Sequence, residues 1–385
     1  MEKPHHRCEN VSLTVAPTQT HARTQGASVQ THCAFATPAA AGPDLHAEWG
    51  ELADRAAATP FNHPGWIATW ADAFADQPLS LYGIRREGRL VGIAPFLERR
   101  RIVVSPTNWH TPRFELVAAD ESARHELARG LLERGRHRVD LSFLDEGSGD
   151  IGALRAAATE DRRLLIDRPI QRSLYVDLDG DWEDYTSELG GKVLREVRRR
   201  RRRLEAEGAV EVAFVTPDEG VEALLEEGFS VEGSGWKHER GTAIASRPET
   251  RSFYTGVARW AAERGWLLLA FLRVDGRVAA FDLCIEQGGR TYVLKGGYDP
   301  AFRQFAPRTL LLHDSLQRAF ARGGRSYEFL GADEDYKRRW ATGVRERRRL
   351  QAFGRTPAGR GGYTLWTVGR RAGKRAVAIR DKLAR

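Results

Sequence analysis

Apolar positions in the last third of the chain are grouped in a way typical of three neighbouring β-strands. Residues 267–274 and 278–286 are strongly apolar, and the Asp275-Gly276 pair between them is typical of a tight hairpin turn. A third apolar run, 291–298, follows a second turn at Gly288-Gly289. The pattern therefore predicts a small antiparallel sheet.

The pattern changes to a helical period after this predicted sheet. We expect a loop at 299–308, a helix of about four turns, a short strand at 327–330 and a second helix that contains residues 335–340. A loop that leads from a strand into a helix lies at the positive end of the helix dipole. This order of elements is suited to bind a phosphate-bearing ligand.

Two domains of α/β (α+β) class are predicted, each with a mixed central sheet flanked by helices. We place the first at 44–167 and the second at 168–354, because a chain of 385 residues suits two domains of roughly 150 residues. A hairpin with an apolar-Ala motif occurs in each, at 90–95 and at 277–281, and a helix and a strand follow it. This internal similarity favours a duplicated fold.

The two ends of the chain differ in composition from these domains. Residues 1–43 mix His, Thr, Gln, Ala and Pro and hold too little apolar surface to offset chain entropy, so we expect a disordered arm. Residues 355–385 hold nine basic side chains and one acid, Asp381, whereas the rest of the chain holds 51 of each sign. The net charge of +8 therefore belongs to a basic C-terminal tail, at most an amphipathic helix.

Several kinds of site are absent from the sequence. No apolar run approaches the ~20 residues that cross a bilayer, and no Walker loop, GxSxG elbow or HExxH pair occurs. The three cysteines, Cys8, Cys33 and Cys284, lack the spacing of a metal site or a disulfide framework. We therefore expect no metal and a cytoplasmic protein with free thiols.

Short aromatic and basic motifs recur in order between residues 44 and 353. They are Thr59-Pro60-Phe61 with His63-Pro64 and Trp66, Asn108 with Thr111-Pro112-Arg113, Trp182 with Tyr185, Ser234-Gly235-Trp236-Lys237, Gly241-Thr242-Ala243-Ile244, Leu294-Lys295 with Tyr298-Asp299, and Tyr336-Lys337 with Trp340. In order and spacing these motifs resemble the CelD/BcsL-type GNAT acetyltransferases, which are linked by name to cellulose biosynthesis and related to the FemAB peptidyltransferases.

The resemblance implies two tandem GNAT-like domains, the second of which carries the acyl-transfer site. It also implies acetyl-CoA or another acyl-CoA as co-substrate. The loop before the helix departs from the family's usual Pro-Gly ending, because it reads Ala306-Pro307-Arg308, and glycine is what lets backbone N–H groups approach a pyrophosphate. Arginines supply positive charge there instead. The predicted cofactor-binding residues are Arg303, Gln304, Phe305, Ala306, Pro307, Arg308 and Thr309.

Three residues near the ends of predicted strands are candidates for catalysis. The resemblance implies that Lys337 steadies donor and acceptor, and a cation there would stabilise charge on the attacked carbonyl oxygen. Asp299 is the first candidate for a base or for orienting the acceptor, and Tyr336 is a further candidate. Tyr298 and Glu328 remain alternates for the base. A surface lysine and an ordinary Asp-Pro turn are the structural alternatives.

A second group of residues is predicted to bind the acceptor. Trp236 and Lys237 lie in a Gly/Ser-rich loop and suit a ligand with a sugar ring and a negative charge, because apolar sugar faces pack on aromatic rings. Lys295 interrupts an apolar strand and needs a partner if it points inward. Tyr298 ends the same strand. These four residues are the predicted substrate-binding set.

Six consecutive arginines at 198–203 are the densest charge in the chain. A helix with this run exposes cations on every face, so we expect it to line an anionic substrate cleft. Together with the basic tail it could also contact tRNA or an anionic membrane. Neither a helix-turn-helix nor zinc spacing accompanies the run, so no sequence-specific DNA binding is expected.

Together with the resemblance, these features predict an acyltransferase, most simply an acetyl-CoA-dependent N- or O-acetyltransferase. The acceptor would be an amine or hydroxyl of a sugar, a polysaccharide precursor or a similar polar molecule, and transfer would be direct within a ternary complex. A role in exopolysaccharide biosynthesis follows from the family's name alone. Two alternatives stay open: a FemAB-like aminoacyltransferase that uses aminoacyl-tRNA, and a non-catalytic anion-binding scaffold at a membrane or polysaccharide synthase.

Overall fold

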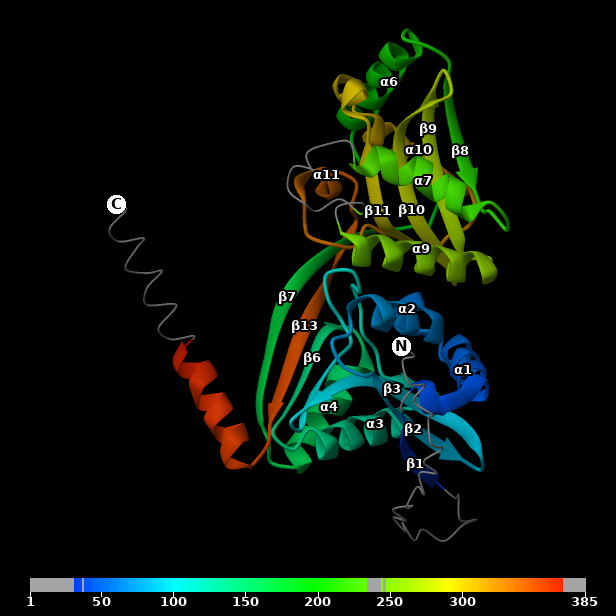
Figure 1. Cartoon of the computed structure of the whole chain (residues 1–385). Coiled ribbons are helices and arrows are strands. Elements are labelled where there is room, and N and C mark those ends of the chain that lie inside the picture. Colours follow the sequence, from blue (N-terminus) through cyan, green and yellow to red (C-terminus); the bar gives the residue numbers. More distant parts are fainter. Residues whose placement is uncertain (1–30, 37, 234–243, 245–246, 370–385) are drawn as a thin grey trace, which may run out of the picture.

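One long mixed β-sheet runs through two lobes of the molecule and carries helices on its faces (Figure 1). The computed structural model describes residues 31–36, 38–233, 244 and 247–369. Along the sheet the strands lie in the order β1-β2-β3-β4-β6-β13-β7-β12-β11-β10-β9-β8, and β5 pairs with β3. The predicted class, a mixed α/β fold with flanking helices, is confirmed.

The first lobe is built around a hairpin, a crossover helix and a further strand. Its elements are β1 (Thr31–Ala36), α1 (Pro38–Arg55), η1 (Pro60–Asn62), α2 (Pro64–Phe74), β2 (Ser80–Arg86), β3 (Arg89–Arg99), β4 (Ile102–Val104), β5 (Val117–Ala118), α3 (Glu121–Arg134), β6 (Arg138–Asp145) and α4 (Gly149–Glu160).

The second lobe contains the three strands, the helix, the short strand and the final helix in the predicted order. The predicted loop at 299–308 holds a short 3-10 helix and the start of the long one. The elements are α5 (Trp182–Glu188), α6 (Gly191–Glu205), β8 (Val210–Val215), α7 (Val221–Gly233), α9 (Pro248–Glu263), β9 (Leu267–Val274), β10 (Arg277–Gln287), β11 (Arg290–Tyr298), η3 (Pro300–Phe305), α10 (Pro307–Ala321), β12 (Ser326–Glu328) and α11 (Asp335–Arg338).

The two lobes repeat one arrangement of strands, as expected of a duplicated fold. In the first lobe β2, β3 and β4 are antiparallel neighbours, and α3 then crosses to β6, which lies parallel to β4. In the second lobe β9, β10 and β11 are antiparallel neighbours, and α10 crosses to β12, which lies parallel to β11. A parallel pair needs such a crossover, and each lobe supplies it with one helix.

Two long strands are exchanged between the lobes. Strand β7 (Leu164–Asp177) follows the first lobe in the chain but pairs antiparallel with β12 of the second. Strand β13 (Gly343–Phe353) follows the second lobe but pairs antiparallel with β6 of the first. The two strands also pair with each other along the whole of β13. Each lobe is therefore completed by a strand from the other half of the chain (Figure 1).

One apolar core joins the lobes. It contains side chains from α1 and α2 of the first lobe and from α7, α9 and β9–β11 of the second. Helices α2 and α9 approach closely because both use glycine at the contact. A Cβ on Gly65 would lie 2.1 Å from the Trp260 ring, and a Cβ on Gly256 would lie 2.6 Å from Thr69. These small residues fix how near the two lobes can come.

The structure differs from the expectations at three places. Strand β7 runs unbroken across the predicted domain boundary at 167–168, which remains a prediction. Strand β13 is not predicted by the hydrophobic pattern, because residues 345–349 are all charged. Part of the arm expected to be disordered, 31–36 and 38–43, lies in β1 and α1. Residues 357–369 of the tail form a helix, as the sequence allowed. None of the described helices combines the length and apolarity that a bilayer span requires.

The charged strand β13 allows a test of how the lobes are held together. Arg347 is buried, and its guanidinium lies 2.7 Å from the Asp145 carboxylate. Arg347→Met should lower the free energy of unfolding by about 3 kcal/mol, because it removes one partner of a buried carboxylate. Urea denaturation measures the loss. The double variant Arg347→Met/Asp145→Asn should recover most of it, and wild-type stability in the single variant would contradict this account.

Candidate active site

The candidate site is a cavity of about 630 Å³ where β11 and β12 separate and the first lobe meets the second. The two parallel strands pair only at residues 290–292 and 326–328. Beyond Tyr292, β11 keeps β10 as its neighbour but has no partner on the other side among the described residues. That edge offers backbone N–H and C=O groups to a ligand that binds in an extended form.

The N-terminus of α10 forms one wall of the cavity. Ala306 precedes the helix with φ 48° and ψ 57°, a left-handed conformation that costs a residue with a Cβ about 1 kcal/mol. Pro307 takes the first helical position, where its missing N–H has no intrahelical partner to lose. Ala306 thus adopts a conformation that glycine would favour. Arg308, which stands where the resemblance leads us to expect glycine, lies within the first turn of the helix.

An ion pair between a partly exposed guanidinium and a buried carboxylate spans the cavity wall between α10 and β10. The Arg308 guanidinium donates to Asp282 Oδ1 at 3.1 Å. Burial disfavours the charged form of Arg308, but the adjacent Asp282 carboxylate outweighs burial and raises the pKa of the guanidinium. Gly296 makes room for the pair, because a Cβ there would lie 1.6 Å from Asp282 Oδ1. The glycine in the middle of β11 is therefore required by the packing of this pair.

Lys337 is held by the loop that follows β12. Its side chain is buried, and Nζ donates to the carbonyl oxygens of Leu330 at 3.0 Å and Ala332 at 3.1 Å. Nζ also pairs with the Glu334 carboxylate at 2.8 Å. Leu330 and Gly331 both have positive φ, 52° and 58°, which turns the loop around the ammonium group. The three N–H donors of the lysine thus have these three oxygens as partners.

Tyr336 lies between two cations at the mouth of the cavity. Its ring centroid is 5.7 Å from the Arg308 guanidinium carbon and 5.7 Å from Lys337 Nζ. Arg308 also donates to the Tyr336 hydroxyl at 3.4 Å. The ring is 38% exposed, so a ligand in the cavity can reach it. These two cation–π contacts hold the Tyr336 ring in place.

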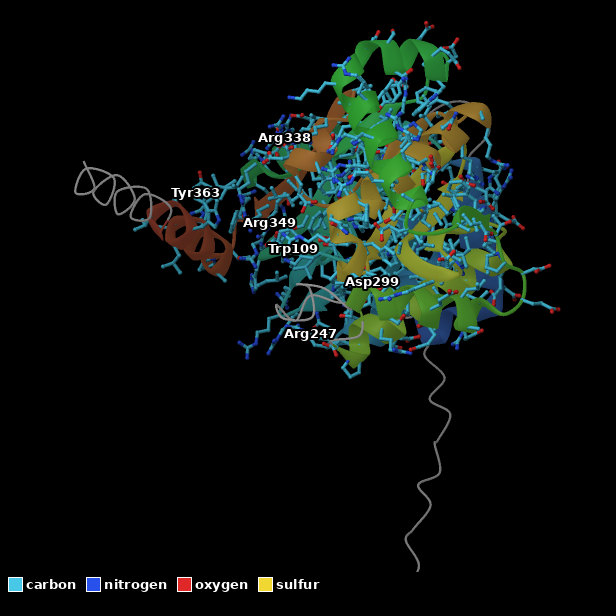
Figure 2. The ribbon with its side chains drawn as sticks, turned by 90° about the horizontal axis from the view of Figure 1, so that it is seen from above. Trp109, Arg247, Asp299, Arg338, Arg349 and Tyr363 are labelled. Carbon is cyan, nitrogen blue, oxygen red and sulfur yellow. The ribbon has the colours of Figure 1, made fainter. Side chains whose placement is uncertain are left out.

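The first lobe contributes a loop to the opposite side of the cavity. Trp109 is 79% exposed and lies at the cavity lining (labelled in Figure 2). His110 Nδ1 is 3.0 Å from the Tyr254 hydroxyl, and Lys295 Nζ lies 5.3 Å from the centroid of the Tyr254 ring. Burial, and then the charges of Lys295 and Arg247, lower the pKa of His110 to about 4. The imidazole is therefore neutral at pH 7.

Most of the predicted site residues meet in this one cavity, and some do not. Lys295, Tyr298, Tyr336, Lys337, Arg303 and Ala306 to Thr309 line it. Gln304 and Phe305 do not, and Phe305 packs in the core beneath α6 with the Arg203 guanidinium 5.6 Å from its ring. Trp236 and Lys237 lie outside the described residues. In the described part of the chain no cluster of three or more His, Cys, Asp or Glu could hold a metal ion.

Asp299, the first candidate for a base, does not line the cavity. Its Oδ1 accepts from the Ala301 N–H at 2.9 Å, so it caps η3. Its Oδ2 accepts from Arg277 Nε at 3.0 Å. Both carboxylate oxygens are thus engaged on the outside of the loop, as the alternative reading of an Asp-Pro turn predicts.

Sequence reasoning did not identify several residues of the cavity. Asp282 could have been noticed as a carboxylate between Phe281 and Leu283 in an apolar strand, where a buried charge requires a partner. Gly296 could have been noticed as a strand-interior glycine, which often marks a close approach. Trp109, His110 and Tyr254 carry no such signal, because only the packing of the two lobes brings them to the site.

Residues 191–338 match the model of the acetyltransferase (GNAT) domain family. The chain has a GNAT-type acyltransferase fold. The matched segment contains the splayed strands β11 and β12 and the helix α10 between them, so it covers most of the cavity. No curated protein sequence matches the chain.

Two solved structures share this GNAT-type fold over both lobes. A FemX structure is 13% identical, with a TM-score of 0.55 over 79% of this chain and 95% of that chain. The C-terminal domain (DUF2156) of a putative lysylphosphatidylglycerol synthetase from Agrobacterium fabrum is 14% identical, with a TM-score of 0.51 over 83% of this chain and 96% of that chain. At these identities the similarity concerns the fold. The family model supports the GNAT part of the predicted resemblance, and the CelD/BcsL part stays a prediction.

Gly296 should be intolerant of a side chain. Gly296→Ala places a methyl group where the Asp282 carboxylate lies and separates it from Arg308. We expect a loss of about 3 kcal/mol in the free energy of unfolding, because a buried carboxylate is separated from its cation. Gly83→Ala in β2 is the matched control, since its Cβ would meet Leu90 at an ordinary 3.6 Å. Equal stability of the two variants by urea denaturation would refute the packing role of Gly296.

The lowered pKa of His110 predicts a loss of stability in mild acid. The imidazole has a pKa of about 4 in the folded protein against 6.5 for an ordinary histidine. The folded state therefore binds fewer protons than the unfolded chain, and stability falls as the pH drops from 6.5 towards 4. Urea midpoints at pH 7.5 and 5 measure the fall. His110→Asn should reduce this dependence, and part of it should remain because burial also lowers the pKa of His63 to about 4. Parallel curves for variant and wild type would contradict the assignment.

Proposed function

We propose that this protein is an acyltransferase that uses acetyl-CoA or another acyl-CoA and transfers the acyl group to an amine or hydroxyl of a polar acceptor. The observation that carries the proposal is the convergence of three features on one cavity. These are the open edge of β11, the N-terminus of α10 and the buried ammonium of Lys337. The match of residues 191–338 to the GNAT domain supports the same reaction class.

The donor is assigned to the side of the cavity formed by β11 and α10. Amide groups of the pantetheine arm can pair with the open edge of β11, as an added strand does. The phosphates lie at the N-terminus of α10, where the positive end of the helix dipole favours an anion. Arg303 is exposed at the cavity lining and has no ion-pair partner among the described residues, so it is available to a phosphate. Arg308 instead holds the wall through Asp282.

Acyl transfer then proceeds by direct attack. The acceptor nitrogen or oxygen forms a bond to the thioester carbonyl carbon, the C–S bond breaks, and the thiolate leaves and takes up the proton that the acceptor loses. Lys337 stabilises the negative charge that develops on the carbonyl oxygen. One of its three N–H donors must leave Glu334 to do so, and the Glu334 side chain, 50% exposed, has room to turn away. Tyr336 holds the adjoining wall.

The acceptor is assigned to the side formed by the first lobe. Trp109 offers an exposed ring on which a sugar face can pack, and Lys295 and Tyr298 line the same space. The predicted acceptor, a sugar or polysaccharide precursor, suits an aromatic ring beside a cation. A role in exopolysaccharide biosynthesis would follow if such a sugar is the acceptor. Asp299 caps η3 and is not assigned a part in the chemistry.

A FemAB-like aminoacyltransferase is the second candidate. The fold shared with FemX over 95% of that chain favours it, and the arginine-rich helix α6 offers charge for a tRNA. The two donors are distinguished by competition against bound acetyl-CoA in calorimetry. An acyl-CoA enzyme binds acetyl-CoA saturably, and aminoacyl-tRNA does not displace it. Displacement by charged tRNA, with no thiol released from acetyl-CoA, would replace the first candidate by the second.

Lys337 provides the sharpest test of catalysis. Lys337→Gln should lower kcat for thiol release from acetyl-CoA by about 10²–10³-fold, because it removes the charge that stabilises the oxyanion. Glu334→Gln is the matched control and should retain wild-type activity or exceed it, since it frees a donor of the lysine. Thermal unfolding of both variants shows whether the loop is intact. A folded Lys337→Gln protein with unchanged kcat would remove Lys337 from the chemistry. No thiol release by the wild type with any candidate acceptor would favour a non-catalytic anion-binding scaffold.

A further inference from the structure

The helix at residues 357–369 has an inner face that packs on the body and an outer face that is apolar but exposed. On the inner face the Tyr363 ring lies 5.5 Å from the Phe353 ring, edge to face, at the end of β13. Leu365 is 76% exposed and Val368 is 58% exposed. Figures 1 and 2 show the helix projecting from the side of the molecule, away from both lobes. A helix at the surface of a protein in water normally turns its polar side chains outward, so this arrangement is the reverse of the usual one.

The surroundings of this outer face are mixed aromatic, aliphatic and cationic. A hollow between the helix and β7 is lined by Arg168, Pro169, Leu365, Trp366 and Gly369. Tryptophan and arginine beside aliphatic side chains are typical of the boundary between headgroups and acyl chains, where an indole has one apolar and one polar side and an arginine reaches water. The helix and the neighbouring β7 together therefore carry the side chains that such a boundary accommodates.

The sequence continues the same pattern beyond the described helix. Small or apolar residues recur at intervals of three and four positions, which is the spacing of one helix face. Between residues 355 and 385 there are nine basic side chains and one acid. Six of the apolar residues share this spacing: Leu365, Val368, Ala372, Ala376, Ile379 and Leu383. A narrow apolar stripe in a strongly basic segment is typical of sequences that lie in the surface of an anionic bilayer.

We propose that the helix 357–369 and the basic sequence after it dock the protein onto an anionic lipid surface. Charge alone would suit a nucleic acid equally well, because Lys and Arg contact phosphates of either kind. The exposed Leu365 and Val368 decide between the two, since a lipid surface buries them and a phosphate backbone does not. This docking is independent of the acyl-transfer chemistry, whose residues lie elsewhere.

Co-sedimentation of the full chain with vesicles tests the proposal. The protein should bind phosphatidylcholine vesicles that contain phosphatidylglycerol and not vesicles of phosphatidylcholine alone. Leu365→Gln/Val368→Gln should weaken this binding by about tenfold or more, because two apolar side chains no longer insert. Val344→Thr is the matched control, since Val344 is 43% exposed at the opposite end of β13 and should leave binding unchanged.

Three results would overturn the proposal. The first is equal binding of the Leu365→Gln/Val368→Gln variant and the wild type to anionic vesicles, which would leave charge as the only contribution. The second is equal binding of the wild type to vesicles with and without phosphatidylglycerol. The third is failure to bind either vesicle together with salt-sensitive retention on immobilised tRNA, which would assign the segment to RNA. Circular dichroism confirms that the exposed substitutions leave the fold intact.

Discussion

The exchange of β7 and β13 is the constraint on which the rest of this structure depends. Each lobe lacks its last strand until the other half of the chain supplies it, and the two exchanged strands pair with each other along all of β13. The lobes therefore form one sheet and cannot separate without breaking that ladder. The cavity lies at this junction, so its two sides are held in a fixed relation.

The second constraint is the early end of the pairing between β11 and β12. A parallel pair that continued to Tyr298 would close the sheet and leave no space. The helix α10 and the loop after β12 diverge instead. Each places a cation at the edge of the resulting space, and each cation has partners there. Arg308 pairs with Asp282, and Lys337 pairs with Glu334 and two carbonyl oxygens. Paired in this way, the buried charges form firm walls around a space that a ligand can enter.

The lining of the cavity was predictable where its residues are neighbours in sequence. The order of strand, loop, helix and strand placed residues 303–309 and Lys337 at one end of a sheet, and the structure lines the cavity with most of them. The prediction for Asp299 rested on position alone, and local hydrogen bonding to Ala301 and Arg277 gave this carboxylate another use. Trp109 and His110 could not be predicted, because nothing near them in sequence indicates a cavity that is built mainly by the second half of the chain.

The sequence by itself determined which segments form helices, strands and turns, because the spacing of apolar residues and the turn residues specify structure over a few neighbouring positions. It predicted β9, β10, β11 and α10 in order, and it placed the excess positive charge in the tail. Tertiary structure alone decided the strand exchange. Strand β13 is charged from residue 345 to 349, and its buried Arg347 is stable only beside Asp145 from the first lobe. The charged run becomes a strand because it pairs with residues distant in sequence, and no local pattern in the sequence indicates that pairing.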